Sequence, residues 1–361
     1  MKISRKAVLF VVLVQLLLAT FAAGQDRHEI NFPDILGYKT LKCDFHMHTV
    51  FSDGAVWPTV RVEEAWREGL DAIAITDHIE YQPHKRDIPT SFSRPYEIAL
   101  PTAKEKNILL IKGAEITRDT PPGHFNVLYV EDIDALNTED LIQAARAADA
   151  QRAFLFWNHP GWKPDRKGWF DIHTQLYENK LMHGIEVANG DSYYPEALQW
   201  AIEKNLTMMG NSDSHPPNLI LQTTAENHRT MTLVFARERT AEAVKEALTE
   251  GRTAVWFEKQ LIGKSEYLQA IFRESVEIGK PHQRTRSGIW ITIRNNSAID
   301  IDMERTGTEG PQTLTLPADA TILLKTGNPG GTEPLRLSYV VRNFLIAPDV
   351  GLPVDMTVDL Q

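Results

Sequence analysis

The sequence predicts an α/β barrel followed by a small β-rich domain, and two observations support this. From residue 41, short apolar runs alternate with stretches of helical periodicity. Such alternation implies parallel strands joined by crossover helices, and with seven or more strands a closed barrel is expected. From residue 288, strand-like segments are separated instead by Asn, Gly and Pro turns. That pattern predicts a β-sandwich-like domain.

The elements of the predicted barrel follow in order along the chain. We expect strands at 41–46, 72–76, 108–111, 125–130, 153–157, 184–188, 207–209 and 231–234. Helices are expected at 59–68, 95–107, 138–150, 195–204 and 240–250. Thr138 is the expected N-cap of the third helix, because a threonine hydroxyl can accept from a free backbone N–H of the first turn. The barrel domain should therefore occupy residues 41–257.

The C-terminal part is expected to begin with a helical linker, residues 258–287, with a short helix at 266–276. Strands are predicted at 289–294, 313–316, 321–325 and 335–342, within a small β-rich domain of residues 288–361. This region has no cluster of metal-ligand residues. Its expected role is structural, or to position a substrate.

Composition limits the possible partners. The chain has 361 residues and a formal net charge of −10, so a broad nucleic-acid surface is excluded. An anionic substrate would have to be held by metal ions and a few local cations. Cys43 is the single cysteine, which rules out an intrachain disulfide. It shares a strand face with Leu41 and Phe45, which favours a packed core thiol over a reactive one.

The N-terminus resembles an export signal. Lys2, Arg5 and Lys6 precede an apolar run, and small residues stand at 22–24. We predict a signal peptide over residues 1–24 and a lead-in over 25–40, with a retained membrane anchor as the competing interpretation. After cleavage the protein would have no membrane contact. The absence of disulfides favours a bacterial periplasmic or secreted protein.

Histidines and carboxylates gather near the predicted strand ends. Six of the twelve histidines lie in these short clusters. The active sites of α/β barrels are built at the carboxyl ends of the strands, and imidazole with carboxylate is a ligand set for Mn, Zn or Fe. We therefore predict a multinuclear metal site with the candidate ligands His46, His48, Asp53, His78, Glu115, His124, His159, Asp213 and His215.

Individual positions allow alternatives. His46 and His48 lie on one side of an extended strand end, so both rings can reach one ion, although a pair of partly exposed barrel histidines is the plainer interpretation. Asp53 could instead cap a turn with Gly54. Glu115 could bridge two ions, since a buried lone carboxylate is costly without a partner.

Other residues are expected around the ligands. Asp44 and Asp77 should lie behind them, with Asp77 accepting the second ring proton of a neighbouring histidine or capping a turn. Ser212 and Ser214 suggest a serine hydrolase, but the Gly-x-Ser-x-Gly nucleophile elbow is missing. Four basic residues in loops near the clusters are candidates for holding a phosphate or donating a proton: His84, Arg86, Arg118 and Lys163.

The ordered set of ligand candidates resembles the PHP family, the polymerase and histidinol phosphatase domain. It reads His46-x-His48, Asp77-His78, Glu115, His124, His159 and Asp213-x-His215. The resemblance covers residues 41–257 and implies a distorted (β/α)₇ barrel with two or three divalent ions. The export signal and β-rich tail make the chain similar to secreted bacterial phosphodiesterase-like members.

The resemblance also implies an assignment of ligands to three ions. Four residues would hold the first ion, namely His46, His48, Glu115 and Asp213. Glu115 would bridge to a second ion held by His124 and His159. A third would take His78 and His215. Many members complete the third site with a histidine where this chain has Asp53-Gly54, so Asp53 is the expected substitute.

The implied activity is hydrolysis of phosphomonoesters or phosphodiesters, nucleotide-like or small organic phosphates, by attack of a hydroxide that bridges the ions. His84 is a candidate donor of a proton to the leaving group. Two other classes stay open: a metal-containing binding module without catalysis, and a metal-dependent hydrolase of a non-phosphate ester or amide. The sequence leaves the oligomeric state open.

Overall fold

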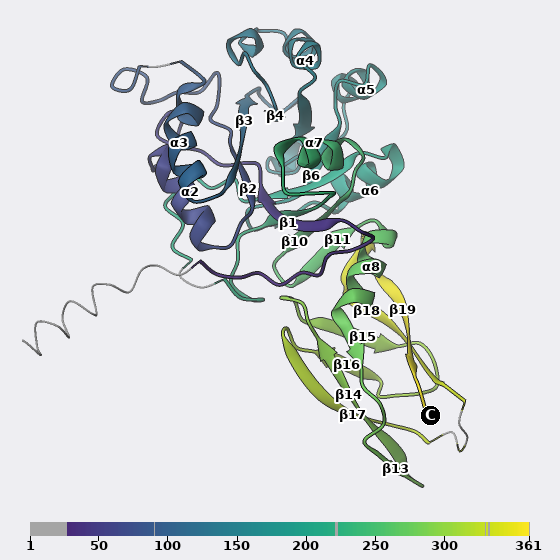
Figure 1. Cartoon of the computed structure of the whole chain (residues 1–361). Coiled ribbons are helices and arrows are strands. Elements are labelled where there is room, and N and C mark those ends of the chain that lie inside the picture. Colours follow the sequence, from purple (N-terminus) through teal and green to yellow (C-terminus); the bar gives the residue numbers. More distant parts are fainter. Residues whose placement is uncertain (1–26, 90, 221–222, 329, 331–332, 361) are drawn as a thin grey trace, which may run out of the picture.

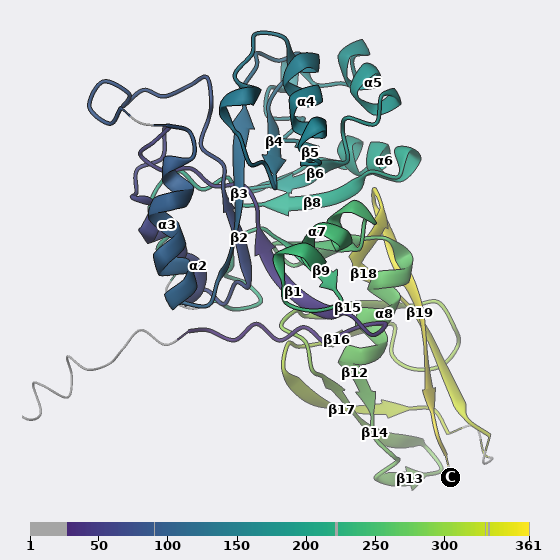
Figure 2. The same ribbon diagram turned by 45° about the horizontal axis from the view of Figure 1, so that its top comes forward.

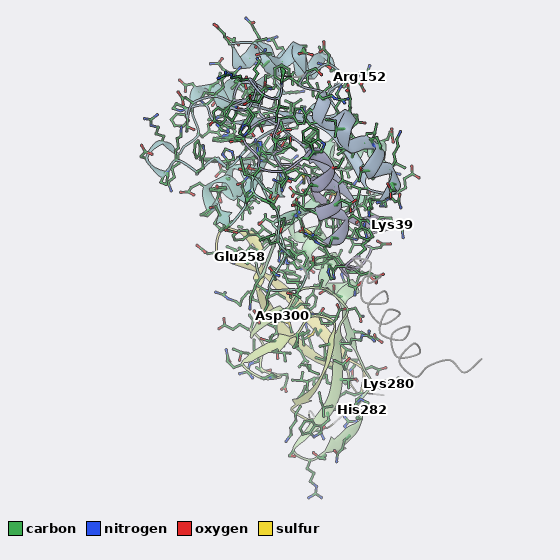
Figure 3. All side chains as sticks on the ribbon, turned by 90° about the vertical axis from the view of Figure 1, so that its left-hand side faces the viewer. Lys39, Arg152, Glu258, Lys280, His282 and Asp300 are labelled. Atoms are coloured by element: carbon green, nitrogen blue, oxygen red, sulfur yellow. The ribbon has the colours of Figure 1, made fainter. Side chains whose placement is uncertain are left out.

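The computed structural model describes residues 27–360, except 90, 221–222, 329 and 331–332, so the predicted signal peptide lies outside the described residues. A barrel domain and a smaller β domain lie end to end (Figure 1). Arg152 marks the far end of the barrel domain and His282 the far end of the small domain, with Glu258 between them (Figure 3). Among the described residues, no helix is long and apolar enough to cross a membrane.

The barrel is built from buried strands that match the predicted apolar runs. In the order of the chain they are β1 (Lys39–Asp44), β2 (Ala72–Ile75), β3 (Leu109–Ile116), β4 (Phe125–Leu128), β5 (Phe154–Trp157), β6 (Gly184–Asn189) and β8 (Thr207–Asn211). β2 pairs in parallel with β1 and β3, and β6 pairs in parallel with β5 and β8. A two-residue strand, β7 (Ser192–Tyr193), folds back on β6.

The expectation that all strands run parallel is wrong at two places. β4 is antiparallel to both β3 and β5. Only residues 117–124 separate β3 from β4, which is too short for a crossover connection, so the chain must turn back. β9 (Met231–Ala236) is antiparallel to β1. The next two strands, β10 (Thr253–Phe257) and β11 (Gln260–Gly263), follow in antiparallel order, β10 against β9 and β11 against β10. The barrel is therefore distorted.

The barrel closes between β8 and the β9–β10 pair. Two threonine hydroxyls bridge this seam: Thr232 Oγ1 accepts from Gly210 N at 3.0 Å, and Thr253 Oγ1 donates to Met208 O at 2.8 Å. At the carboxyl end of β1 the closure becomes a backbone contact, where Asp213 N donates to His46 O and His48 N to Ser214 O. This contact brings together two of the segments that carry predicted ligands.

The helices surround the barrel and are α2 (Pro58–Arg67), α3 (Arg94–Glu105), α4 (Leu141–Ala150), α5 (Asp171–Glu178), α6 (Pro195–Lys204) and α7 (Ala241–Thr249), with short 3₁₀ turns η1 (Asp134–Leu136) and η2 (Pro164–Arg166). The predicted cap of α4 is wrong. Asp140 accepts from Gln143 N at 2.8 Å, while Thr138 donates to Asp140 O. An ionised carboxylate nearer the first turn satisfies the free N–H better. α5 is not among the predicted helices.

The small domain is a sandwich of two sheets, preceded by α8 (Ser265–Ser275). One sheet contains β15 (Ile301–Arg305), β16 (Thr313–Leu316), β18 (Leu335–Ala347) and β19 (Val350–Val358), and the other contains β12 (Val276–Ile278), β13 (Gln283–Thr285), β14 (Gly288–Asn295) and β17 (Ala320–Thr326). The segment expected as a helical linker thus contributes strands as well as a helix.

The two domains share one sheet. β18 pairs in parallel with β11, with Leu261 opposite Phe344. Asn343 of β18 donates to both Lys259 O and Asp300 O. The far end of the β18–β19 hairpin lies beside α6 (Figure 2). The backbone hydrogen bonds of one sheet therefore run from the barrel domain into the small domain.

The lead-in also connects the domains. Asn31 O accepts from Ala298 N at 2.6 Å, and the Phe32 ring packs edge-to-face against Trp256.

Cys43 is fully buried in β1, and burial raises the pKa of its thiol. The cysteine is therefore part of the core, as the strand pattern predicts.

Candidate metal centre

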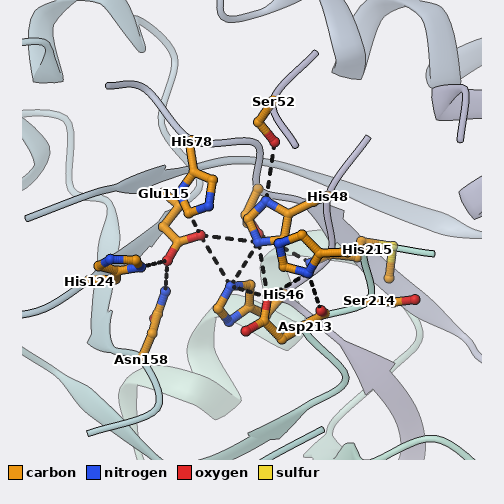
Figure 4. A network of polar contacts seen from close by, with 12 residues as sticks. His46, His48, Ser52, His78, Glu115, His124, Asn158, Asp213, Ser214 and His215 are labelled. Atoms are coloured by element: carbon orange, nitrogen blue, oxygen red, sulfur yellow. Dashed lines mark hydrogen bonds and ion pairs between the residues drawn. The ribbon is translucent and has the colours of Figure 1, made fainter. Parts of the chain in front are cut away.

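All nine predicted ligands meet at the carboxyl end of the barrel, and Figure 4 labels seven of them, including Glu115. His46 and His48 follow β1, Glu115 lies in β3, His124 immediately precedes β4, and Asp213 follows β8. The ring Nε2 atoms of His46 and His48 lie 3.2 Å apart. Period-two alternation therefore turns both rings to one point, as expected.

Glu115 lies at the centre of the cluster and is fully buried. Its Oε2 is 3.2 Å from His46 Nε2 and 3.1 Å from His48 Nε2. Its other oxygen, Oε1, is 2.9 Å from His124 Nδ1 and accepts from Asn158 Nδ2 at 3.0 Å. One carboxylate thus faces two sets of histidines, which is the arrangement expected of a bridging ligand.

Asp213 lies on the opposite side of the same histidine pair. Its Oδ1 is 3.1 Å from His46 Nε2 and 3.0 Å from His48 Nε2. Asp213 has a φ of 50° and His159 a φ of 29°, a left-handed conformation that costs free energy for residues other than glycine. Both strained residues are ligand candidates, which is consistent with a functional constraint on this end of the barrel.

Asp53 joins a group nearer to solvent. Its Oδ1 lies 3.2 Å from His215 Nε2 and 3.6 Å from His78 Nε2. The loop that carries Asp53 folds tightly over His48: a Cβ on Gly54 would come within 2.5 Å of the His48 backbone. Glycine at position 54 therefore allows the carboxylate to reach the histidines. We call His48, Asp53, His78 and His215 the outer group.

The grouping differs in detail from the assignment implied by the resemblance. His159 shares a group with His46 and Asp213, although its Nε2 is also 3.7 Å from Glu115 Oε1. His78 belongs both to the outer group and to a group with Glu115 and His124. The expected substitution of Asp53 for a histidine fits the outer group.

Charges in the cluster are strongly coupled. Burial alone would lower the pKa of His48, but hydrogen bonds and charges from Asp213 and Glu115 raise it to about 10. Burial raises the pKa of Glu115, yet His78 and His46 bring it well below its ordinary value. Burial lowers the pKa of His78 to about 4. Without metal, Glu115 and Asp213 are ionised and protons sit on His46 and His48, so an ion that binds must displace them.

Glu186 is the residue that sequence reasoning missed. It lies in β6, fully buried, and its Oε1 is 2.9 Å from His46 Nδ1. Its Oε2 accepts from His159 N at 2.8 Å. It fixes the ring of one ligand and the backbone of another. The available signal was a single acid within the apolar run 184–188, because a buried carboxylate needs partners.

Of the two roles expected of Asp77, the structure shows the turn cap and not the ring contact. Asp77 accepts from Thr49 N and Oγ1 and from Ser52 Oγ, and reaches His48 only through Ser52. It therefore caps the loop after His48 instead of taking a ring proton. Asp44 does lie behind the ligands, where it accepts from Ser212 N and Oγ and from Arg229.

A cavity of about 750 Å³ opens over the cluster. Tyr81 and Trp162 stand at its rim, 52% and 46% exposed, and Tyr194 forms part of its wall. The Tyr194 ring packs against Gly161, where a Cβ would come within 2.7 Å. Of the described residues that line the cavity, none is Lys or Arg.

The four predicted phosphate or proton-donor residues do not line this cavity. His84 and Arg86 are exposed on the loop after β2. Arg118 pairs with Glu80 and donates to Thr138 O. Lys163 lies over the Trp162 ring, 4.5 Å from its centroid, and 3.8 Å from Asp119. Position in the chain indicated proximity to a ligand, but these side chains point elsewhere.

The residues fit several divalent ions. Two buried carboxylate oxygens, Asp53 Oδ1 and Asp213 Oδ1, face histidine ring nitrogens but form no hydrogen bond of regular geometry with the described residues, and buried polar atoms are rarely left so. All donors are imidazole nitrogen or carboxylate oxygen, the ligand types of Mn, Zn and Fe. The fold and site therefore define an α/β-barrel protein with a buried histidine–carboxylate cluster suited to more than one ion.

Comparison with known proteins agrees with this class. Residues 44–229 match the PHP domain and residues 276–357 match an Ig-like domain. A crystal structure of a two-domain protein from Bacteroides vulgatus, described as containing a predicted PHP-like metal-dependent phosphoesterase, is 44% identical, with a TM-score of 0.87 over 93% of this chain and all of that chain. The chain belongs to the PHP family and carries a C-terminal Ig-like domain.

More distant similarities cover only part of this chain. A metal-dependent phosphoesterase candidate from Bifidobacterium adolescentis is 18% identical over 58% of this chain and 96% of that chain, with a TM-score of 0.40. An uncharacterized protein from Methanocaldococcus jannaschii is 37% identical over 83 residues, which cover 22% of this chain and 36% of that protein. The chain thus spans about a third of the length of this curated relative.

Proposed function

We propose that this protein is a metal-dependent phosphodiesterase that acts on small substrates with an aromatic or nucleoside-like ester group. The observation that carries the proposal is the convergence of nine histidine and carboxylate side chains in one cluster, seven of which line one cavity. Bound ions would lower the pKa of a coordinated water and neutralise the phosphoryl oxygens. His46, His48, Glu115, His124, His159 and Asp213 would hold the inner ions, and the outer group would hold a third.

The preference for a diester follows from the charge of the cavity. A phosphomonoester is largely a dianion near neutral pH, whereas a diester carries one negative charge. Because no Lys or Arg is among the described residues that line the cavity, nothing but the ions and histidines would offset the second charge of a monoester. The diester is therefore the better-matched anion.

The aromatic side chains of the cavity support an aromatic ester group. Tyr81 and Trp162 are large, exposed rings beside the ligands, and such rings gain free energy by stacking on a planar group. Burial, followed by the charges of Glu186 and Asp213, raises the pKa of Tyr194 well above its ordinary value. Tyr194 therefore keeps its phenolic proton at neutral pH, and we assign it to donate a hydrogen bond to the substrate.

The proposed function is tested with paired substrates, bis-p-nitrophenyl phosphate and p-nitrophenyl phosphate, after reconstitution with Mn²⁺. We expect metal-dependent turnover that favours the diester and is lost in Glu115→Ala. Tyr194→Phe should lower kcat/KM roughly tenfold, the cost of about one charge-assisted hydrogen bond, with unchanged metal content. Bound metal without turnover of either ester would favour a binding module, and turnover of acyl substrates alone a non-phosphate hydrolase.

We also propose that the protein works outside the cytoplasm, in the bacterial periplasm or secreted, as a scavenger of small phosphodiesters. The support is the cationic start, apolar run and small residues of positions 1–24. Intact-mass measurement of protein recovered from a bacterial periplasmic extract tests this. A mature chain that begins near Gln25 is expected. Retention of all 361 residues would favour the retained anchor, and absence of the protein from the periplasmic extract and the medium would contradict export.

A further inference from the structure

We propose that Arg61 is a positioning residue that holds the outer group together and thereby makes the third ion site. Arg61 lies in α2, is not a ligand, and is fully buried. The proposal rests on the metal centre described above. It is carried by the contacts of the guanidinium, which reach the segments of two outer ligands, His48 and His215.

The guanidinium joins the segment of His48 to the segment of His215. Arg61 Nε donates to His48 O at 2.8 Å. Its Nη2 donates to Ser214 O at 2.8 Å and to His215 O at 2.7 Å. Its Nη1 donates to Pro216 O at 2.9 Å and to Ser214 Oγ at 3.1 Å. One side chain thus fixes the backbone of two outer ligands relative to each other.

The loop of Asp53 is tied to the same point. Ala55 N donates to His215 O at 2.8 Å, the carbonyl that also accepts from Arg61. The guanidinium therefore fixes the positions of three of the four outer ligands. It contacts the backbone of His48 and of His215 directly, and it reaches the Asp53 loop through Ala55. The fourth, His78, is held separately by Thr117 Oγ1, 2.6 Å from its Nδ1.

Glu64 fixes the guanidinium itself. Glu64 Oε2 accepts from Arg61 Nη1 at 2.8 Å, and the two side chains are 4% and 0% exposed. The other oxygen of Glu64 accepts from Asn218 N at 2.7 Å. A buried charge is tolerated only when it is paired and its donors are satisfied, and these contacts meet that condition. Arg61 and Glu64 together therefore hold residues 214–218 against α2.

The inner ligands other than His48 have supports that do not involve Arg61, so loss of Arg61 should act mainly on the outer ion. Glu186 holds His46 and the backbone of His159. Asn158 holds Glu115. Asp44 accepts from Ser212, the residue before Asp213. None of these contacts involves Arg61.

Lysine cannot replace this residue. The carbonyl oxygens that accept from Arg61 lie around its planar guanidinium. The ammonium group of a lysine, on a flexible side chain, can bind only some of these oxygens at once. Arg61→Lys keeps the charge but should let the loops of His48 and His215 separate. We expect it to lose about one Mn²⁺ per chain, or to bind that ion on the order of tenfold more weakly, while the inner ions stay.

The experiment counts Mn²⁺ per chain by mass spectrometry of the metal and follows Mn²⁺ titration of the wild type, Arg61→Lys and Arg61→Met, with thermal unfolding as a check of the fold. Arg252→Lys is the matched control. Arg252 is also buried and donates to Phe235 O, but Phe235 pairs with Thr40 at the opposite end of β1 from the ligands.

The outcomes are distinct. Selective loss of one ion in the Arg61 variants, with Arg252→Lys like the wild type, supports the proposal. A folded Arg61→Lys protein with wild-type metal content and affinity overturns it. If the Arg61 variants do not fold, Glu64→Gln is measured in their place with the same criteria. A wild-type protein that binds fewer than two ions overturns the proposed metal centre itself.

Discussion

At the scale of residues, the ligand types and their spacing carried most of the information. His46, His48 and Glu115 were predictable because their strand ends must meet at one edge of a barrel. Glu186 was not, because an acid inside an apolar strand gives no indication of which histidine it faces. One of the two roles expected of Asp77, the ring contact, was wrong for a related reason: a carboxylate beside a histidine in sequence reaches the backbone of another loop in space.

Glu186→Gln tests the importance of the ring contact. The amide cannot hold the proton of His46 Nδ1 as an ionised carboxylate does, so His46 should become a poorer and less oriented ligand. We expect metal affinity or activity to fall 10- to 100-fold, measured by Mn²⁺ titration. Glu196→Gln is the control, because Glu196 forms an exposed ion pair with Lys167, away from the metal cluster. Equal affinity in both variants would refute the role of Glu186.

At the scale of elements, local signals decided what could be predicted. α6 agrees with its predicted range because Pro195 starts it and Asn205, with a φ of 50°, ends it. α5 was missed: it has only eight residues, too few for a clear period. It is stabilised by His173, whose Nδ1 accepts from Phe170 N and whose Nε2 lies 2.8 Å from Pro122 O.

His173 makes α5 sensitive to acid. Burial lowers the pKa of His173 to about 4, so the folded state keeps it neutral while the unfolded chain, with a pKa near 6.5, binds a proton. Its contribution is complete above pH 6.5 and is lost as the pH falls toward 4. Between pH 6.5 and 5 the metal-free protein should lose about 2 kcal/mol from this residue.

Urea unfolding in a chelator at both pH values measures this loss. His173→Gln should be less stable at pH 6.5 but should lose less stability on acidification than the wild type. His28→Gln serves as the comparison, because His28 lies in the lead-in and outside α5. Equal pH dependence of the wild type and His173→Gln would exclude His173 as the source.

At the scale of the whole molecule, the order of strands and turns indicated two domains but not their connection. A parallel pairing between β11 and β18 joins residues more than eighty positions apart, with Leu261 opposite Phe344. No local pattern indicates such a contact. The shared sheet, Asn343 and the lead-in contact at Ala298 together imply that barrel and Ig-like domain unfold as one unit.

Calorimetry tests that coupling. We expect one unfolding transition for the metal-free protein. Asn343→Ala removes donors to Lys259 O and Asp300 O and leaves those carbonyls unpaired, at a cost of about 1–3 kcal/mol. It should lower Tm or split the transition in two, whereas Asn179→Ala, an exposed helix-end change, should do neither. Two well-separated transitions in the wild type would contradict a single unit.

The central claim is that the barrel mouth holds a multinuclear metal centre. The most direct measurement is anomalous diffraction at the manganese edge from crystals grown with Mn²⁺. We predict at least two peaks between Glu115 and its surrounding histidines, with a third within the outer group of His48, Asp53, His78 and His215. A single peak, or none, in a crystal whose side chains keep the positions described above would contradict it.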